Sequence, residues 1–177
     1  MYGRLVEVTI RPYEPRDATG VADVFYRSVR EVALSDYTAD QVKAWAPGPG
    51  DVDQERRRCG DGRLVLIAAD QQGRVVAFVD LEPDGHIDRL FCAPEAVGLG
   101  IASRLYEAVE AAARERGIRR LFTEASITAR PFFEAQGFAV LAPQVVTCRG
   151  SEFVNYRMER VLAEPAAADG GRDPGSS

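Results

Sequence analysis

The chain is divided between short apolar runs and stretches in which apolar residues recur every three or four positions. Short or alternating apolar runs are typical of strands, whereas steps of three and four place apolar side chains on one face of a helix. The expected strands cover residues 5–13, 63–70, 74–81, 86–92, 119–125, 138–148 and 152–162. The expected helices cover residues 17–34, 38–45, 51–58, 101–117 and 128–136. This order predicts a mixed α+β domain.

The turns between these elements indicate how the strands pair. Gln71-Gln72-Gly73 and Pro83-Asp84-Gly85 are typical turn sequences, so residues 63–92 should form an antiparallel meander. A single strand–helix–strand unit follows, and such units cross over right-handed. One domain is expected over residues 1–162, because the Ala-, Gly- and Pro-rich residues 163–177 cannot bury a core and predict a disordered tail.

Composition and charge exclude several classes of protein. The net charge of −5 and the lack of a dense Lys/Arg run argue against nucleic-acid binding. No run approaches the roughly 20 apolar residues of a membrane span. The first residues do not resemble a signal peptide, so a cytoplasmic protein is expected. Three separated cysteines and a single histidine, His86, suggest neither a disulfide framework nor a metal site.

The most informative segment is a strand that runs through Gly98-Leu99-Gly100 into a helix. Two glycines at a helix start let the backbone approach a ligand and present free N–H groups to it. The helix dipole adds positive potential, so this loop suits a phosphate or pyrophosphate, although glycines also serve plain turns. A dinucleotide-binding motif is less well matched because Ser103 stands at the third glycine position, and no Gly-Lys-Ser/Thr of a P-loop follows.

The element order, with Val97-Gly98-Leu99-Gly100-Ile101-Ala102 after the fourth strand, resembles the GNAT superfamily of acetyl-CoA-dependent N-acetyltransferases. Residues 129–138 look like the short helix of that family that ends in Gly-Phe. Residues 124–134, together with residues 37–45, look like the YafP-like branch. The resemblance spans residues 7–162. It implies the GNAT-type fold, a mixed and mostly antiparallel sheet of six to seven strands flanked by about four helices.

The resemblance also implies where acetyl-CoA binds. Backbone groups of the strand before the loop would pair with the pantetheine arm, and amides of the loop and helix start would hold the pyrophosphate. The residues expected at the cofactor are Leu90, Phe91, Cys92, Val97, Gly98, Leu99, Gly100, Ile101, Ala102, Ser103, Ser126 and Phe133. Three of them depart from the family pattern. Val97 replaces an Arg or Gln, Ser126 replaces a common asparagine, and Phe133 replaces the tyrosine that many members use as general acid.

Acetyl transfer to an amine needs a base, because an ammonium has no lone pair with which to attack a thioester. His86 suits this role, since an imidazole has an unperturbed pKa of about 6.5, although it is equally an ordinary histidine at a strand end. Asp88 shares its strand face and could orient His86, bind a cationic acceptor, or pair with Arg89 or another base. Glu82 is a further candidate. Tyr156 is a candidate general acid that an alternating strand could turn to either face.

Tyr37 and Trp45 flank the short helix that covers the acceptor site in this family, so they could frame the substrate or belong to the core. The expected function is direct transfer of an acetyl group from acetyl-CoA to an amine of a small molecule or peptide, in a ternary complex. A homodimer would fit such a fold. The alternative is a non-catalytic acyl-CoA-binding or regulatory module. Val97 and Phe133 favour that alternative, whereas His86 and the glycines favour an enzyme.

Overall fold

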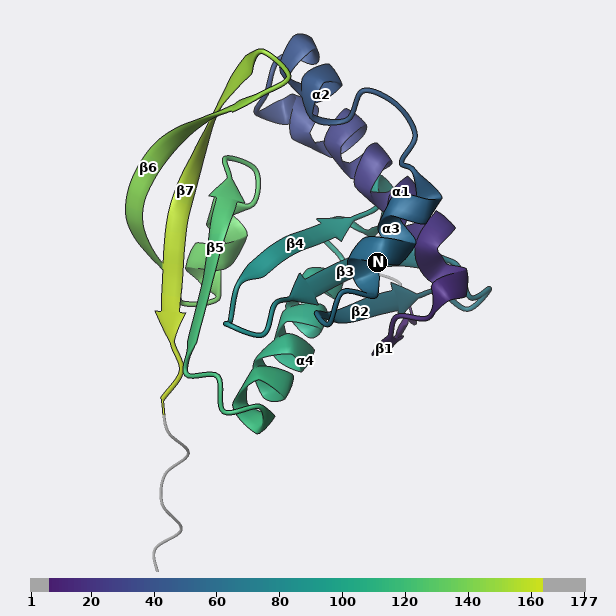
Figure 1. Cartoon of the computed structure of the whole chain (residues 1–177), viewed down its shortest axis with the longest axis vertical. Helices are drawn as coiled ribbons and strands as arrows, with labels where there is room; N and C mark the ends of the chain where they lie inside the picture. The colour runs from purple at the N-terminus through teal and green to yellow at the C-terminus, as the bar shows by residue number, and fades with distance from the viewer. Residues whose placement is uncertain (1–6, 164–177) are drawn as a thin grey trace, which may run out of the picture.

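The computed structural model describes residues 7–163, and the strands in this part of the chain form two antiparallel sheets (Figure 1). The first sheet has the order β1-β2-β3-β4, with β1 at Thr9–Pro12, β2 at Leu64–Ala69, β3 at Val75–Leu81 and β4 at Ile87–Cys92. The second has the order β5-β7-β6, with β5 at Arg120–Ser126, β6 at Ala139–Cys148 and β7 at Ser151–Val161. Each expected strand is present, and the meander over residues 63–92 is confirmed. The tail expected beyond residue 163 lies outside the described residues.

Helices cover both faces of the first sheet. The α-helices of the described residues are α1 at Ala18–Arg27, α2 at Ala39–Trp45, α3 at Val52–Cys59, α4 at Ile101–Glu115 and α5 at Arg130–Ala135, of which α2 and α5 pack against the second sheet instead. In Figure 1, α1 and α3 lie on one side of the first sheet and α4 lies on the other. The largest core side chains, Phe78, Leu105 and Tyr106 among them, fill the space between these layers. No helix of the described residues is both long and apolar enough to cross a bilayer.

The helix expected over residues 17–34 is confirmed as an unbroken helical segment, although only part of it is α-helical. The α-helix ends at Arg27, and the chain continues as a π-helical turn at Ser28–Val32 and a 3-10 turn at Ala33–Ser35. Serine and valine are weak helix formers, and the wider turn leaves Val29 fully buried. Val29 packs in a second cluster that joins this segment to β7 through Tyr37 and Phe153.

The two sheets meet at one end and separate at the other. Among the described residues, the backbone contacts between β4 and β5 are a parallel bridge from His86 to Phe122 and a 3.1 Å hydrogen bond from the Phe122 N–H to the Gly85 carbonyl. Because the chain crosses over through α4, β4 and β5 run parallel to each other where they meet. Beyond that bridge the strands diverge (Figure 1), which leaves the carboxyl-terminal half of β4 without a strand on that side.

Gly85 has no room for a side chain at this junction. Its φ of +98° is left-handed, and a Cβ there would lie 2.1 Å from the Arg120 carbonyl oxygen. We expect Gly85→Ala to lower the free energy of unfolding by roughly 2–4 kcal/mol, measured by urea denaturation. Gly73→Ala is the matched control, because Gly73 has a similar φ of +78° and open space around it. Equal losses in both variants would show that the close contact at Arg120 is unimportant.

Candidate functional site

A cavity of about 330 Å³ opens where the two sheets diverge. Its wall is mostly apolar and comes from the π turn, the end of β4, the glycine loop and the start of α5. The lining residues are Ser28, Val29, Val32, Ala33, Trp45, Leu90, Phe91, Cys92, Ala96, Val97, Gly98, Gly100, Ile101, Ala102, Ser103, Ser126, Thr128, Ala129 and Phe132. Ten of the residues expected at the cofactor are therefore brought together in one cavity, and Leu99 and Phe133 are not among its lining residues.

The glycine loop presents the N-terminus of α4 to this cavity. Gly98 and Gly100 have φ of +77° and +75°, and a Cβ at either would meet nothing within 4 Å. Glycine is therefore required at both positions by the left-handed backbone, because a side chain would have enough space. Gly100 is the N-cap of α4 and offers no side chain to the free N–H groups of the first turn. Leu99, at the tip of the loop, is exposed.

The short helix α5 turns one phenylalanine to the cavity and buries the next. The Ser126 hydroxyl accepts a hydrogen bond of 3.1 Å from the Ala129 N–H and so supports the turn into α5. Phe133, expected at the cofactor, is only 3% exposed and packs against Phe138 in the core. Phe132 lies on the cavity wall instead, because consecutive residues of a helix point about 100° apart.

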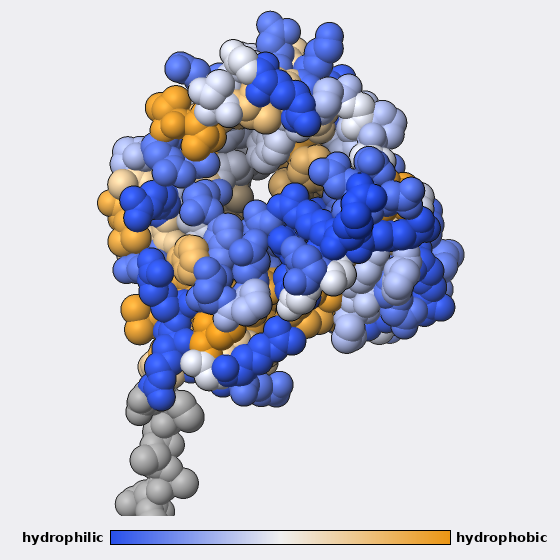
Figure 2. Space-filling model, in the orientation of Figure 1, coloured by the Kyte–Doolittle hydropathy of each residue, from blue (hydrophilic) through white to orange (hydrophobic). Residues whose placement is uncertain are grey.

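A second cavity of about 190 Å³ adjoins the first. It lies among α2, β5, β6 and β7, and its lining residues are Tyr37, Trp45, Glu124, Ser126, Val146, Cys148, Phe153 and Asn155. Trp45 and Ser126 line both cavities, so the two cavities are direct neighbours. Figure 2 shows the surface hollowed between the second sheet and the helices α1 and α2.

Tyr37 is held firmly in the wall of the second cavity. Its hydroxyl donates to the Val154 carbonyl at 3.1 Å and accepts from the Ile127 N–H at 2.8 Å. Its ring centroid lies 5.7 Å from that of Trp45 and 5.8 Å from that of Phe153. Burial raises the pKa of the Tyr37 phenol. Tyr37 therefore offers the cavity an aromatic surface, while its hydroxyl is engaged by the backbone.

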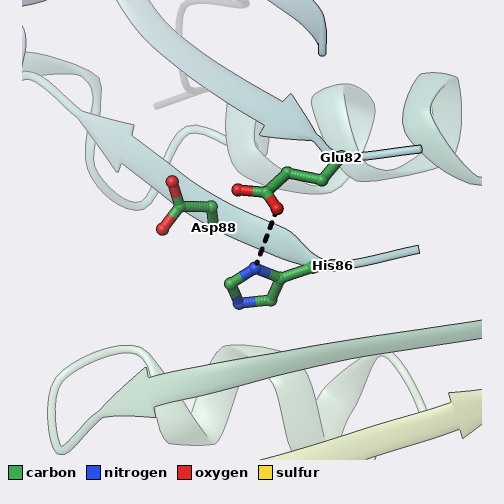
Figure 3. Close-up of side chains that lie close together, drawn as sticks. All are labelled: Glu82, His86 and Asp88. Carbon is green, nitrogen blue, oxygen red and sulfur yellow. Dashed lines mark ion pairs between the residues drawn. The ribbon is translucent and has the colours of Figure 1, made fainter. Parts of the chain in front are cut away.

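His86 points from the start of β4 toward β5 (Figure 3) and contacts a carboxylate that the sequence reasoning missed. Its Nε2 lies 2.6 Å from Oε2 of Glu124, and its Nδ1 lies 3.7 Å from Oε2 of Glu82. The ring stacks on Phe122 with centroids 5.0 Å apart. Glu124 lines the second cavity, whereas His86 is among the lining residues of neither. Glu124 therefore stands between His86 and the second cavity.

The strand pattern contained a signal for Glu124. Glu124 and Ser126 are two positions apart on β5, so they share a face of the strand, and both line the second cavity. The pairing with His86 spans 38 residues and depends on the crossover that sets β5 beside β4. Sequence spacing alone could not reveal that contact.

Asp88 is engaged by two arginines. It is the extra residue of a β-bulge, because Asp80 pairs with Arg89 and the next partner pair skips to Ile87. Its carboxylate accepts from Arg58 and, at 2.8 Å, from Arg63. Burial opposes ionisation, but these guanidinium groups outweigh it and hold the pKa of Asp88 below its ordinary value.

Of the three roles expected for Asp88, the structure shows the pairing with basic side chains, which are Arg58 and Arg63. One ligand atom each of Glu82, His86 and Asp88 lies within 4.8 Å of the others (Figure 3). Because two guanidinium groups already bind Asp88, the cluster has the character of an ion-pair network rather than of a metal centre.

Neither Tyr156, the candidate general acid, nor Cys92, the one thiol that lines the first cavity, is well placed to act in the reaction. Tyr156 is half-buried under the Arg130 guanidinium, 4.4 Å from its ring centroid, and is among the lining residues of neither cavity. Cys92 lines the first cavity, but burial raises the pKa of its thiol to about 11. A thiol that stays protonated at neutral pH is a poor nucleophile, which argues against a covalent route through Cys92.

Comparisons with known proteins agree with the geometry. The family model described as an acetyltransferase (GNAT) domain matches residues 33–160. YafP of Escherichia coli K12, named an uncharacterized N-acetyltransferase, is 33% identical over 151 residues, which cover 85% of this chain and 94% of YafP.

Solved structures of acetyltransferases share the fold. A GCN5-related N-acetyltransferase from Rhodopseudomonas palustris superposes with a TM-score of 0.82 at 33% identity, covering 92% of this chain and 100% of that one. The PaiA N-acetyltransferase of Thermoplasma acidophilum, solved with coenzyme A, gives a TM-score of 0.69 at 18% identity, covering 88% and 99%. The family predicted from the glycine loop and the Gly-Phe helix is thus confirmed, and the chain belongs to the GNAT acetyltransferases.

Proposed function

We propose that this protein transfers the acetyl group of acetyl-CoA directly to an amine of a small molecule within a ternary complex. The observation that carries the proposal is the meeting of two cavities at Trp45 and Ser126. The first has an uncapped helix N-terminus at its mouth, which suits a pyrophosphate. The second contains a carboxylate, Glu124, which suits an amine.

Acetyl-CoA is the acyl donor, and the first cavity fits it. Residues Leu90 to Cys92 would bind the pantetheine arm through backbone groups, because no described strand pairs with that edge of β4 beyond His86. The N–H groups from Gly98 to Ser103 would hold the pyrophosphate. Val97 is half exposed at the loop and supplies no polar group, so backbone groups would carry that contact.

Glu124 and His86 have different roles in the reaction of the acceptor amine. The amine nitrogen attacks the thioester carbonyl carbon, so that a C–N bond forms, the C–S bond breaks and coenzyme A leaves as a thiolate. Glu124 takes the proton that the amine loses, and His86 acts as a positioning residue that fixes Glu124 through the 2.6 Å contact at Oε2. The proton that Glu124 takes can pass through solvent to the thiolate, because a thiol with a pKa of about 8.5 is a much weaker acid than a carboxylic acid, so no further side chain is assigned that step.

The test of this function is acetyl transfer itself. Purified protein is incubated with acetyl-CoA and a panel of primary amines, and the release of free thiol is followed together with the mass of the acetylated amine. A second candidate, a non-catalytic acyl-CoA-binding module, is favoured by the burial of Phe133 at the position of the usual tyrosine. That candidate predicts tight binding of coenzyme A in calorimetry and no transfer to any amine.

Ala102→Glu should weaken the binding of coenzyme A about tenfold or more, measured as Kd by calorimetry. Ala102 lines the first cavity in the first turn of α4, where an added carboxylate would oppose the pyrophosphate. Because a negative charge at a helix start favours the helix, the variant should keep its fold. Ala102→Gln has the same size without the charge and should lose much less. Equal losses of affinity for coenzyme A in both variants would contradict the binding of the pyrophosphate at the N-terminus of α4.

A further inference from the structure

The second cavity has one polar end and an otherwise apolar lining. Tyr37, Trp45 and Phe153 contribute three aromatic rings in mutual edge or tilted contact, with centroids 5.7 to 6.0 Å apart. Val146 of β6 adds an aliphatic side chain. Rings locked together in this way present a preformed apolar surface, which favours a ligand with an apolar body of its own.

The polar groups of this cavity are suited to an amine and poorly suited to an anion. Glu124 holds His86 through Oε2 and has a second oxygen for another donor. The Oδ1 atom of Asn155 is buried and has no hydrogen-bond partner in the structure. Among the described residues that line the cavity, none carries a positive charge. A carboxylate on the acceptor would therefore find no cation there, whereas an amine would find acceptors for its N–H groups.

The second cavity has room for about one ring. An apolar protein cavity of about 150 Å³ can hold benzene, so about 190 Å³ has room for a six-membered ring and a short arm that bears nitrogen. A long polyamine would extend its further ammonium groups beyond the cavity and would gain no contact between an apolar body and the aromatic rings.

We infer that the acceptor is a small primary amine in which a short chain joins the nitrogen to a single ring, and that the ring and the chain carry no charge. This inference rests on the proposed acetyl transfer and adds the substrate class. The ring would lie among Tyr37, Trp45 and Phe153, and the nitrogen would lie at Glu124, beside the junction with the first cavity.

The first test compares acceptors. The protein is assayed with 2-phenylethylamine and cyclohexylmethylamine against ethanolamine, spermidine and glycine, at fixed acetyl-CoA. We expect kcat/KM for the two ring-bearing amines to exceed that for each of the others by at least about tenfold, since burial of a ring contributes more than 1.4 kcal/mol. Transfer that is as fast or faster with the hydrophilic amines would overturn the substrate class and leave acetyl transfer intact. No transfer to any amine would overturn both proposals.

The second test changes the cavity itself with a matched pair of variants. Val146 lines the cavity, and its neighbour Val145 is 62% exposed on the other face of β6. Val146→Phe should lower kcat/KM for 2-phenylethylamine about tenfold or more and weaken its calorimetric binding to the complex with coenzyme A. Val145→Phe should change neither quantity. Similar effects of the two variants, or none from Val146→Phe, would show that the ring lies elsewhere.

Discussion

Glu124→Gln should lower kcat/KM for amine acetylation by about 10²- to 10³-fold while the Kd for coenzyme A stays within about twofold. The amide keeps the size of the side chain and can still bond to His86, but it cannot take a proton from the amine. Glu124 lines the second cavity and not the first, so the binding of coenzyme A in the first cavity should be unaffected. The measurement is steady-state kinetics with the best acceptor of the panel, with coenzyme A binding measured by calorimetry.

A control variant tests the specificity of the effect of Glu124→Gln, and a variant of His86 separates its role from that of Glu124. Glu159→Gln is a control on the neighbouring strand β7, where Glu159 pairs with Arg120 outside both cavities, and it should be silent. His86→Ala should lose less than Glu124→Gln, because it removes only the partner that positions Glu124. If His86→Ala instead abolishes transfer while Glu124→Gln retains it, His86 itself would be the base.

The sequence predicted those parts of the site that lie close together along the chain. The glycine loop and the end of β4 are contiguous, and left-handed glycines followed by a helix have few structural uses, so the first cavity could be anticipated. The second cavity could be anticipated only at Tyr37 and Trp45, which were expected to frame the substrate and which line it. Its walls come from α2, β5, β6 and β7, and the pairing of Glu124 with His86 exists only because the crossover sets β5 beside β4.

Local geometry explains the smaller errors. A helical pattern says which residues face inward, but it does not distinguish an α turn from the π turn at Ser28–Val32, since both bury Val29. The same limit applied to α5, where a rotation of one residue decides whether Phe132 or Phe133 lines the cavity. Asp88 was correctly placed beside His86, but the arginines that bind it come from α3 and the segment before β2.

The largest effect on stability is expected at Arg89, whose guanidinium is almost fully buried behind the site. Its Nε lies 2.6 Å from Oδ2 of Asp80, its Nη1 lies 2.7 Å from Oε2 of Glu55, and the guanidinium stacks over the ring of Phe78. Asp80 has no exposed surface. We expect Arg89→Met to lower the free energy of unfolding by about 3–5 kcal/mol at pH 7, measured by urea denaturation, because it leaves a buried carboxylate without its main partner.

The pH dependence distinguishes lost charge compensation from lost packing. Burial raises the pKa of Asp80 above its ordinary value of 3.8, and Arg89 is the cation that counters this most strongly. Without Arg89 the folded-state pKa rises further, although Arg63 remains 3.3 Å away. A carboxyl whose pKa is higher in the folded state favours folding when protonated, and that advantage is lost as the pH rises through the folded pKa.

The stability deficit of Arg89→Met relative to the wild type should therefore shrink as the pH is lowered from 7 through the acid range, because Asp80, with its raised pKa, takes up a proton. A deficit that stays constant over this range would instead attribute the loss to the packing of Arg89 on Phe78. Arg120→Met is the matched control, because Arg120 is half exposed and its pairing with Glu159 should contribute no more than about 1 kcal/mol over the same range. The pair of Asp80 and Arg89 lies at the bulge of β4, close to the start of the strand where His86 reaches Glu124.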